Sequence, residues 1–304
     1  MAISWPDLLR AEATLTASVV AGLALGELVL ASGAADRIFR PLLPRLRTWR
    51  VPPRAAQALA LALGSPRAGA GLLSSGYLQG DLSREETVFG TLCLAFPAYL
   101  RRWITTASLA LGLAGTTGLL YALVLLGRSA VRFLWLLGLL RRHGVPREET
   151  PQDLPPPSGA ERRRRLARVL LVSLPWAWTF FALTYALMPS FEALLLEHLG
   201  HTALLPPAGW TVAAAALAHA TASLAAAGGA LASGELSTAQ ALLALLLGNA
   251  IGTFTRVLRQ NVGYWLGIFP RELLRPLLAW HLGTLLPLEG ITLLAAAAAV
   301  RAGF

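Results

Sequence analysis

Four polar side chains recur at helical spacing inside one of the apolar stretches of this chain. Asn249, Thr253, Arg256 and Gln260 follow one another at intervals of four, three and four residues. At about 100° per residue these positions fall on one face of a helix, while the apolar residues between them face elsewhere. Lipid cannot satisfy a polar stripe, so the stripe must face protein or water. Two interpretations stay open: it lines the path of a polar or anionic solute, or it is a hydrogen-bonding seam between packed helices.

A second group of candidates surrounds a break in another apolar stretch, at residues 55–79. Two apolar pieces are interrupted there by Gly64-Ser65-Pro66-Arg67. Proline and glycine break helices, and each piece is too short to cross a bilayer, so a re-entrant hairpin or a discontinuous helix is expected. Such a break places a helix N-terminus where it can attract an anion. Ser65 and Arg67 are therefore solute-binding candidates, against the alternative of a simple surface turn.

Two more charged residues lie in or beside apolar stretches. Arg102 stands at the position in the first half of the chain that Arg256 occupies in the second, which suggests a paired role in binding. Glu27 lies deep in an apolar stretch, where a carboxylate is costly unless it is protonated or paired. It is a candidate ion or proton site, or a structural partner for an arginine such as Arg67.

The sequence predicts no metal site, no cofactor and no enzymatic centre. Two histidines near residue 200 are three positions apart and follow Glu197, whereas zinc hydrolases place two histidines four apart with the glutamate between them. Cys93 is the single cysteine, which excludes a multi-cysteine metal site. His281 and Glu289 flank the last apolar stretch and fit no specific motif. No nucleophile motif and no paired aspartates occur on the apolar stretches.

The elements that carry these residues are expected to be membrane-spanning helices. Mean hydropathy is +0.58, and 55% of the residues are hydrophobic while 14% are charged, which indicates an all-α polytopic membrane protein. The net charge of +10 comes from arginine alone. Arginines beside apolar stretches set topology and meet anionic lipid, so the bilayer is the expected partner and nucleic acid is not. The stretches long enough to span lie at about residues 13–33, 103–127, 166–188, 208–232 and 276–300.

The chain repeats itself once with an offset of 154 residues. Two short motifs recur without a gap, and in both copies a serine followed three residues later by Glu or Gln predicts a capped helix start. The counterpart of the break at Pro66 lacks a proline, which allows one continuous helix there. The recurring motifs are Pro52-Pro53 with Pro206-Pro207, and Gly80-Asp81-Leu82-Ser83 with Gly234-Glu235-Leu236-Ser237.

The charge of the connectors predicts that the two copies are inverted in the membrane. Residues 37–54 carry six arginines, whereas their counterpart at 188–209 carries none. Positive charge accumulates in cytoplasmic loops, so two inverted-topology repeats with re-entrant or broken helices are expected, as in secondary transporters. The predicted organisation is an interfacial lead-in at 1–12, repeat 1 at 13–140, a cytoplasmic Pro/Arg-rich linker at 141–165 and repeat 2 at 166–304. The N-terminus is expected outside and the protein in the inner membrane as a multi-pass protein, with no cleavable signal peptide.

Several of these motifs resemble a known family. The runs Leu63–Gly69 and Gly80–Glu86, with the glycine- and aromatic-rich run Gly263–Phe269, are similar to the nucleoside recognition or Gate-domain membrane proteins. That group includes the spore maturation membrane proteins and the gate regions of ferrous-iron transporters. The resemblance covers roughly residues 15–125 and 166–300, and it implies transport or gating of a small polar solute. The chain has no Walker-type glycine loop, so no nucleotide-driven activity is expected.

Two functions follow from these features. The first is a transporter or gated permease for a small polar or anionic solute, whose site lies at the repeat interface. The alternative is a membrane assembly or scaffold subunit that acts with a protein partner, as spore maturation proteins occur in pairs. Small residues on the apolar helices also permit a homodimer.

Overall fold

The described part of the chain is helical throughout. The structure is a computed structural model of all 304 residues, and it describes residues 51–144, 205–218 and 220–303, with the isolated positions 6 and 13. Within those ranges there is no strand, so the all-helical prediction is confirmed there. Several predicted features lie outside the described residues: the lead-in except for position 6, the stretches at 13–33 (except position 13) and 166–188, Glu27, the histidines near 200, and the linker after residue 144.

The break at Ser65 forms a helical hairpin. Helix α4 (Pro53–Gly64) ends there, and α5 (Pro66–Leu78) begins with its proline at the first position, where a missing N–H does no harm. The Ser65 hydroxyl accepts a hydrogen bond from the Ala68 amide at 3.3 Å, which caps α5. The helices then fold back on each other so closely that a Cβ on Gly69 would lie 2.5 Å from the Ala58 carbonyl oxygen. The predicted interruption is therefore a tight hairpin.

A second hairpin stands where the sequence allowed one continuous helix. Helix α10 (Pro207–Ala218) and helix α11 (Ala220–Ala232) are separate and pack against each other. The Ser223 hydroxyl donates to the Val212 carbonyl across the pair at 2.8 Å. The continuous-helix expectation is wrong because alanine and glycine line both helices, and such small residues allow close helix contact without a proline at the corner.

Both hairpins lead into a capped helix. Ser83 and Glu86 form a reciprocal capping box at the start of α6 (Arg84–Cys93), and Ser237 and Gln240 form the same box at the start of α12 (Thr238–Arg256). Both predicted caps are confirmed. Helices α4, α5 and α6 begin 154 residues before α10, α11 and α12, respectively. The glycines in left-handed conformation before these caps also correspond: Gly80 (φ 78°) and Gly234 (φ 74°).

Two long apolar helices complete the fold. Helix α7 (Ala95–His143) is interrupted by non-helical backbone at Ala114 and Gly115, and α14 (Leu274–Arg301) contains Pro287. Within the described ranges, two helical segments are long and apolar enough to cross a membrane: 106–143 and 271–301. The predicted stretch at 276–300 lies inside the second. The predicted stretch at 103–127 covers only part of α7, which continues to His143.

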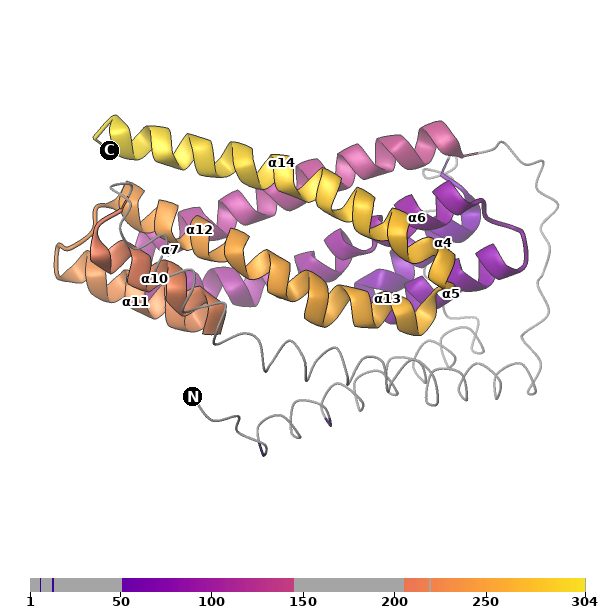
Figure 1. Cartoon of the computed structure of the whole chain (residues 1–304), viewed down its shortest axis with the longest axis horizontal. Coiled ribbons are helices and arrows are strands. Elements are labelled where there is room, and N and C mark those ends of the chain that lie inside the picture. The colour runs from indigo at the N-terminus through magenta and orange to yellow at the C-terminus, as the bar shows by residue number, and fades with distance from the viewer. Residues whose placement is uncertain (1–5, 7–12, 14–50, 145–204, 219, 304) are drawn as a thin grey trace.

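The long helices connect two groups of short ones (Figure 1). Helices α4, α5, α6 and α13 (Gly263–Ile268) gather at one end of the long axis, and α10 and α11 at the other. Helices α7, α12 and α14 run between the groups and contact one another. After α12 the chain continues through the π-helix η2 (Val257–Val262) into α13, and the 3-10 helix η3 (Arg271–Leu273) precedes α14. The three connecting helices are the elements that position the site.

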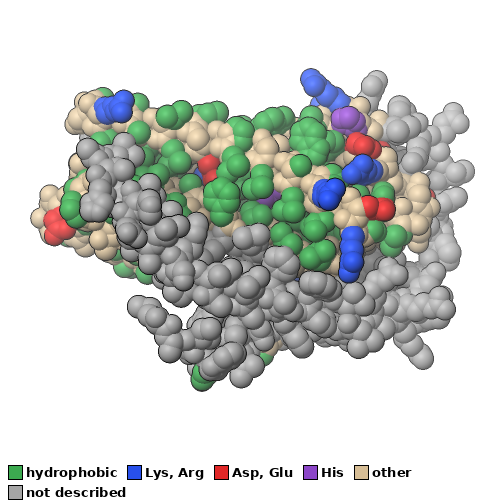
Figure 2. Space-filling view, viewed as in Figure 1, with side chains coloured by type: hydrophobic (Ala, Val, Ile, Leu, Met, Phe, Trp, Pro, Cys, Tyr) green, Lys and Arg blue, Asp and Glu red, His purple; other side chains and the backbone are tan. Residues whose placement is uncertain are grey.

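The surface of the long helices is apolar. Leu134 on α7 and Leu294 on α14 are 61% and 72% exposed. On the face seen in Figure 2, hydrophobic side chains cover most of the middle of the described surface, and charged side chains gather toward the two ends of the long axis. A broad exposed apolar belt of this kind suits contact with lipid or with another protein.

Candidate functional site

The polar stripe on α12 forms a connected group of side chains. Arg256 Nη2 donates to the Asn249 carbonyl at 2.7 Å and to the Thr253 hydroxyl at 2.9 Å. The Thr253 hydroxyl also lies 3.0 Å from the same Asn249 carbonyl oxygen. Three of the four stripe residues are therefore brought together as the helical spacing predicts. The fourth, Gln260, lies on the π-helix η2, where the backbone no longer follows the α-helical period.

Helices α7 and α14 bring opposite charges to this stripe. Arg128 Nη2 donates to the Asn249 side-chain oxygen at 2.6 Å and lies 3.5 Å from Glu289 Oε1. The Thr253 hydroxyl approaches the same Glu289 oxygen at 2.7 Å. The Arg128 and Glu289 side chains are 10% and 3% exposed, so this ion pair is nearly enclosed by protein.

A third arginine lies one helical turn further along α7. Arg132 Nε donates to the Thr284 hydroxyl at 3.1 Å, and its Nη2 donates to His281 Nδ1 at 3.0 Å. Asn261 on η2 contacts the other ring nitrogen of His281 at 3.2 Å, and the Trp265 ring packs edge-on against the imidazole. We call the four charged side chains Arg128, Arg132, Arg256 and Glu289 the arginine cluster.

Three members of this cluster were not among the predicted site residues. The prediction that His281 and Glu289 flank the last apolar stretch is wrong: α14 begins at Leu274, so both lie inside this helix and are buried. Glu289 is the one charged residue between positions 276 and 300, and that isolation in an apolar helix was the available signal. For Arg128 and Arg132 the signal was a spacing of four, which puts both on one face of α7.

The arginine cluster carries unequal numbers of positive and negative charges, and this matters because the side chains are shielded from water. It contains three guanidinium groups and one carboxylate, and all four side chains are buried or largely shielded. Charge separated from water is stabilised only by paired charge or by hydrogen bonds. The neutral oxygens of Asn249, Thr253 and Thr284 supply part of that stabilisation. The described cluster therefore holds more positive than negative charge, which is chemically suited to an anion.

The remaining predicted residues lie elsewhere. Ser65 and Arg67 are at the α4–α5 corner, where the Tyr264 hydroxyl donates to the Pro66 carbonyl at 3.1 Å. Arg102 is exposed on α7, and none of the described contacts joins its side chain to the arginine cluster. In the described ranges no three His, Cys, Asp or Glu side chains lie close enough to hold a metal ion.

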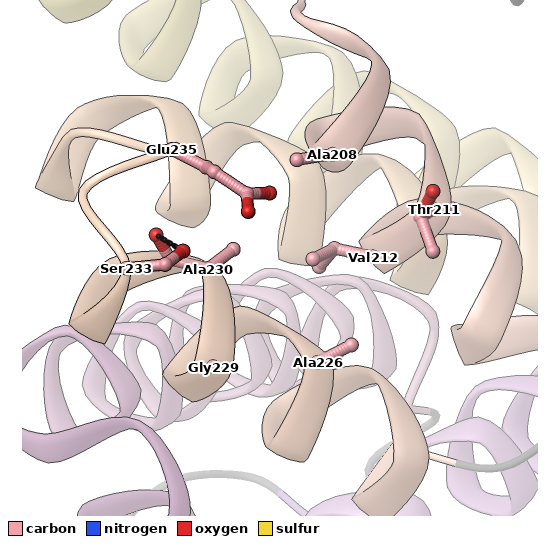
Figure 3. A pocket seen from close by; sticks show the side chains of 8 residues that line it. All are labelled: Ala208, Thr211, Val212, Ala226, Gly229, Ala230, Ser233 and Glu235. Carbon is pink, nitrogen blue, oxygen red and sulfur yellow. Dashed lines mark hydrogen bonds between the residues drawn. The ribbon is translucent and has the colours of Figure 1, made fainter.

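A separate cavity of about 340 Å³ opens at the mouth of the α10–α11 hairpin (Figure 3). The Glu235 carboxylate points into the space, and Ala208 lies on the opposite wall. The positions equivalent to these, 154 residues earlier, are Asp81 and Arg54, which form an ion pair at 2.6 Å. The cavity therefore lies where the first hairpin holds an arginine side chain. Its lining consists of Ala208, Thr211, Val212, Ala226, Gly229, Ala230, Ser233 and Glu235.

Comparison with known proteins finds a distant relative. No protein-family model matches the chain, and no solved structure matches it. The uncharacterized protein MJ0871 of Methanocaldococcus jannaschii is 22% identical over 261 residues, which cover 81% of this chain and 80% of the relative. The chain is thus similar to that archaeal protein over most of the length of both.

Proposed function

We propose that the protein is a multi-pass membrane transporter or gated permease for a small polar or anionic solute. The observation that carries this proposal is the arginine cluster, in which three largely buried guanidinium groups share one carboxylate where α7, α12 and α14 meet. A buried ionisable residue in a membrane helix by default marks a solute or ion pathway, because it is costly to keep there for packing alone.

The proposed architecture is a pair of repeats with opposite orientation in the membrane. It is supported by the matching helix starts in the two halves, by the two hairpins of short helices, and by the unequal arginine content of the corresponding connectors. The two segments that could cross a bilayer and the exposed leucines on α7 and α14 support a membrane location. The resemblance to Gate-domain proteins adds nucleosides to the solutes that need testing.

The test is a thermal-shift screen of the detergent-purified protein against inorganic anions, organic anions, nucleosides and nucleobases. A ligand that binds only the folded state raises the melting temperature by mass action. We expect an anion to do so, and we expect Arg256→Gln to lose the effect while Arg275→Gln, which alters an exposed arginine at the start of α14, retains it. Arg256→Lys keeps the charge and serves as the second variant if the glutamine variant is unstable.

A scaffold role predicts a different result. The protein would show no stabilisation by any solute and would co-purify with a membrane partner in fixed stoichiometry. Such a result would contradict the transport proposal, whereas an anion response that depends on Arg256 would contradict a purely structural role for the cluster.

A further inference from the structure

The carboxylate of the arginine cluster is only loosely paired. The distance of 3.5 Å between Glu289 Oε1 and Arg128 Nη2 is long for a charge-assisted hydrogen bond, and the closer contact at 2.7 Å comes from the neutral Thr253 hydroxyl. Both contacts reach the same oxygen. No described residue donates a hydrogen bond to the second oxygen, Oε2, which is therefore able to carry a proton.

The arginines of the cluster also keep donors that an anion could use. A guanidinium group has five N–H donors. In the described contacts Arg128 and Arg256 each donate through Nη2 alone, and their hydrogen-bond acceptors are neutral oxygens of Asn249 and Thr253. An anion between these two guanidinium groups would replace neutral acceptors by charged ones, which form stronger hydrogen bonds.

Among the charged groups of the arginine cluster, one can change its charge near neutral pH. Arginine stays protonated at every accessible pH. Nδ1 of His281 must accept its hydrogen bond from Arg132, since arginine only donates, and this keeps the imidazole neutral. That leaves Glu289 itself as the group of the cluster that can gain a proton. The charged groups that act on Glu289 from the elements packed against α14 are Arg128 and Arg132 of α7 and Arg256 of α12.

We infer that the solute is an anion and that it binds together with one proton, which is taken up by Glu289. This inference rests on the proposed function and adds the charge of the solute and its coupling ion. When the site is empty, the ionised Glu289 serves as the internal counter-charge of the arginines. A second negative charge at the same guanidinium groups raises the proton affinity of the carboxylate, because two like charges in a poorly solvated site cannot both stay ionised.

The proton balance of this step is simple. A proton from the solvent on the side of solute entry forms an O–H bond with Oε2 of Glu289, and no other bond is made or broken. The carboxyl group becomes neutral as the anion arrives, so a monovalent anion leaves the net charge of the site unchanged, and a divalent anion such as sulfate lowers it by one. Release of the anion on the other side returns the proton to solvent.

Sulfate is a suitable probe, because its charge does not change between about pH 5 and 8. Its binding to the full-length protein would be measured by calorimetry across this range, in pairs of buffers that differ in ionisation enthalpy. We expect uptake of about one proton per sulfate and an affinity that falls by up to about tenfold for each unit of rising pH. Glu289→Gln should bind sulfate more tightly and without pH dependence. Glu289→Asp should keep the pH dependence, as should Glu85→Gln, which alters an exposed carboxylate on α6.

The outcomes separate this inference from the proposed function. Sulfate binding without proton uptake, or a pH dependence that survives in Glu289→Gln, overturns the coupling and leaves the anion site in place. If no anion binds at any pH and no nucleoside or nucleobase stabilises the protein in the thermal-shift screen, the proposed function itself fails. Should Glu289→Gln not fold, the proton uptake of the unaltered protein still decides the question.

Discussion

Filling the cavity beside Glu235 with an arginine should stabilise the protein. The first hairpin shows the arrangement to be copied: Arg54 Nη1 lies 2.6 Å from Asp81 and donates to the Gln79 side chain at 2.9 Å, with 12% of the arginine side chain exposed. In the second hairpin the equivalent position is Ala208. Because the acid there is a glutamate, its carboxylate reaches one methylene further, and Ala208→Arg can meet it across the cavity.

The expected gain can be worked out from the parts of the new side chain. Burying three methylene groups contributes about 2.4 kcal/mol at about 0.8 kcal/mol each. Ordering the arginine costs up to about 2 kcal/mol. A partly exposed ion pair adds about 0.5 kcal/mol. The net gain is about 1 kcal/mol, or roughly 2 °C in melting temperature for a chain of this size.

The assay is a thermal melt of purified variants in one detergent at low and high salt. Ala208→Met supplies a similar apolar stem without charge, and adding Glu235→Gln to Ala208→Arg removes the acid. Ala208→Arg should melt above both, and salt should reduce the difference. A melting temperature for Ala208→Arg no higher than that of Ala208→Met would refute the pairing, and one below the parent protein would show that the cavity does not accept the side chain.

Three further predictions concern backbone contacts, the arginine cluster and a helix cap. Gly69→Ala places a methyl group against the carbonyl oxygen of the facing helix and should cost about 1–3 kcal/mol, while Gly71→Ala, which meets nothing within 4 Å, should be neutral or slightly stabilising in the same thermal melt. Thr253→Val removes the close donor to Glu289 and should lower stability by about 1–3 kcal/mol, whereas Thr253→Ser should retain most of it; equal loss in both would contradict a hydrogen-bonding role. Ser237→Ala should cost about 1 kcal/mol in the same melt through loss of the cap, and no change would mean that the capping bond does not contribute.

Features of the fold that depend on neighbouring residues were predictable from the sequence. The capping boxes at Ser83 and Ser237 need residues only three positions apart, and the corner at Pro66 follows from the backbone limits of proline. The second hairpin was missed because no local signal marks its corner. It exists through the close packing of alanine and glycine, which is a tertiary effect.

Of the three helices that form the candidate site, the contribution of one, α12, was predictable from the sequence. Helical spacing grouped Asn249, Thr253 and Arg256, since all three lie on one regular helix. It could not find the partners, because Arg128 and Glu289 are brought together only when α7 and α14 pack on α12. The backbone changes to the π form at Val257, so the spacing of an α-helix no longer applies at Gln260.

The position of Glu289 on the last helix has a consequence for synthesis of the protein. The chain leaves the ribosome from its N-terminus, so Arg128, Arg132 and Arg256 are all made before the carboxylate that the described structure places among them. Until α14 has been synthesised, the three arginines lack that counter-charge, and their guanidinium groups repel one another. A chain that terminates early, before Glu289, would carry this defect permanently and offer quality-control proteases a substrate that opens readily. Synthesis of α14 therefore supplies the one negative charge of the described cluster after its three positive charges.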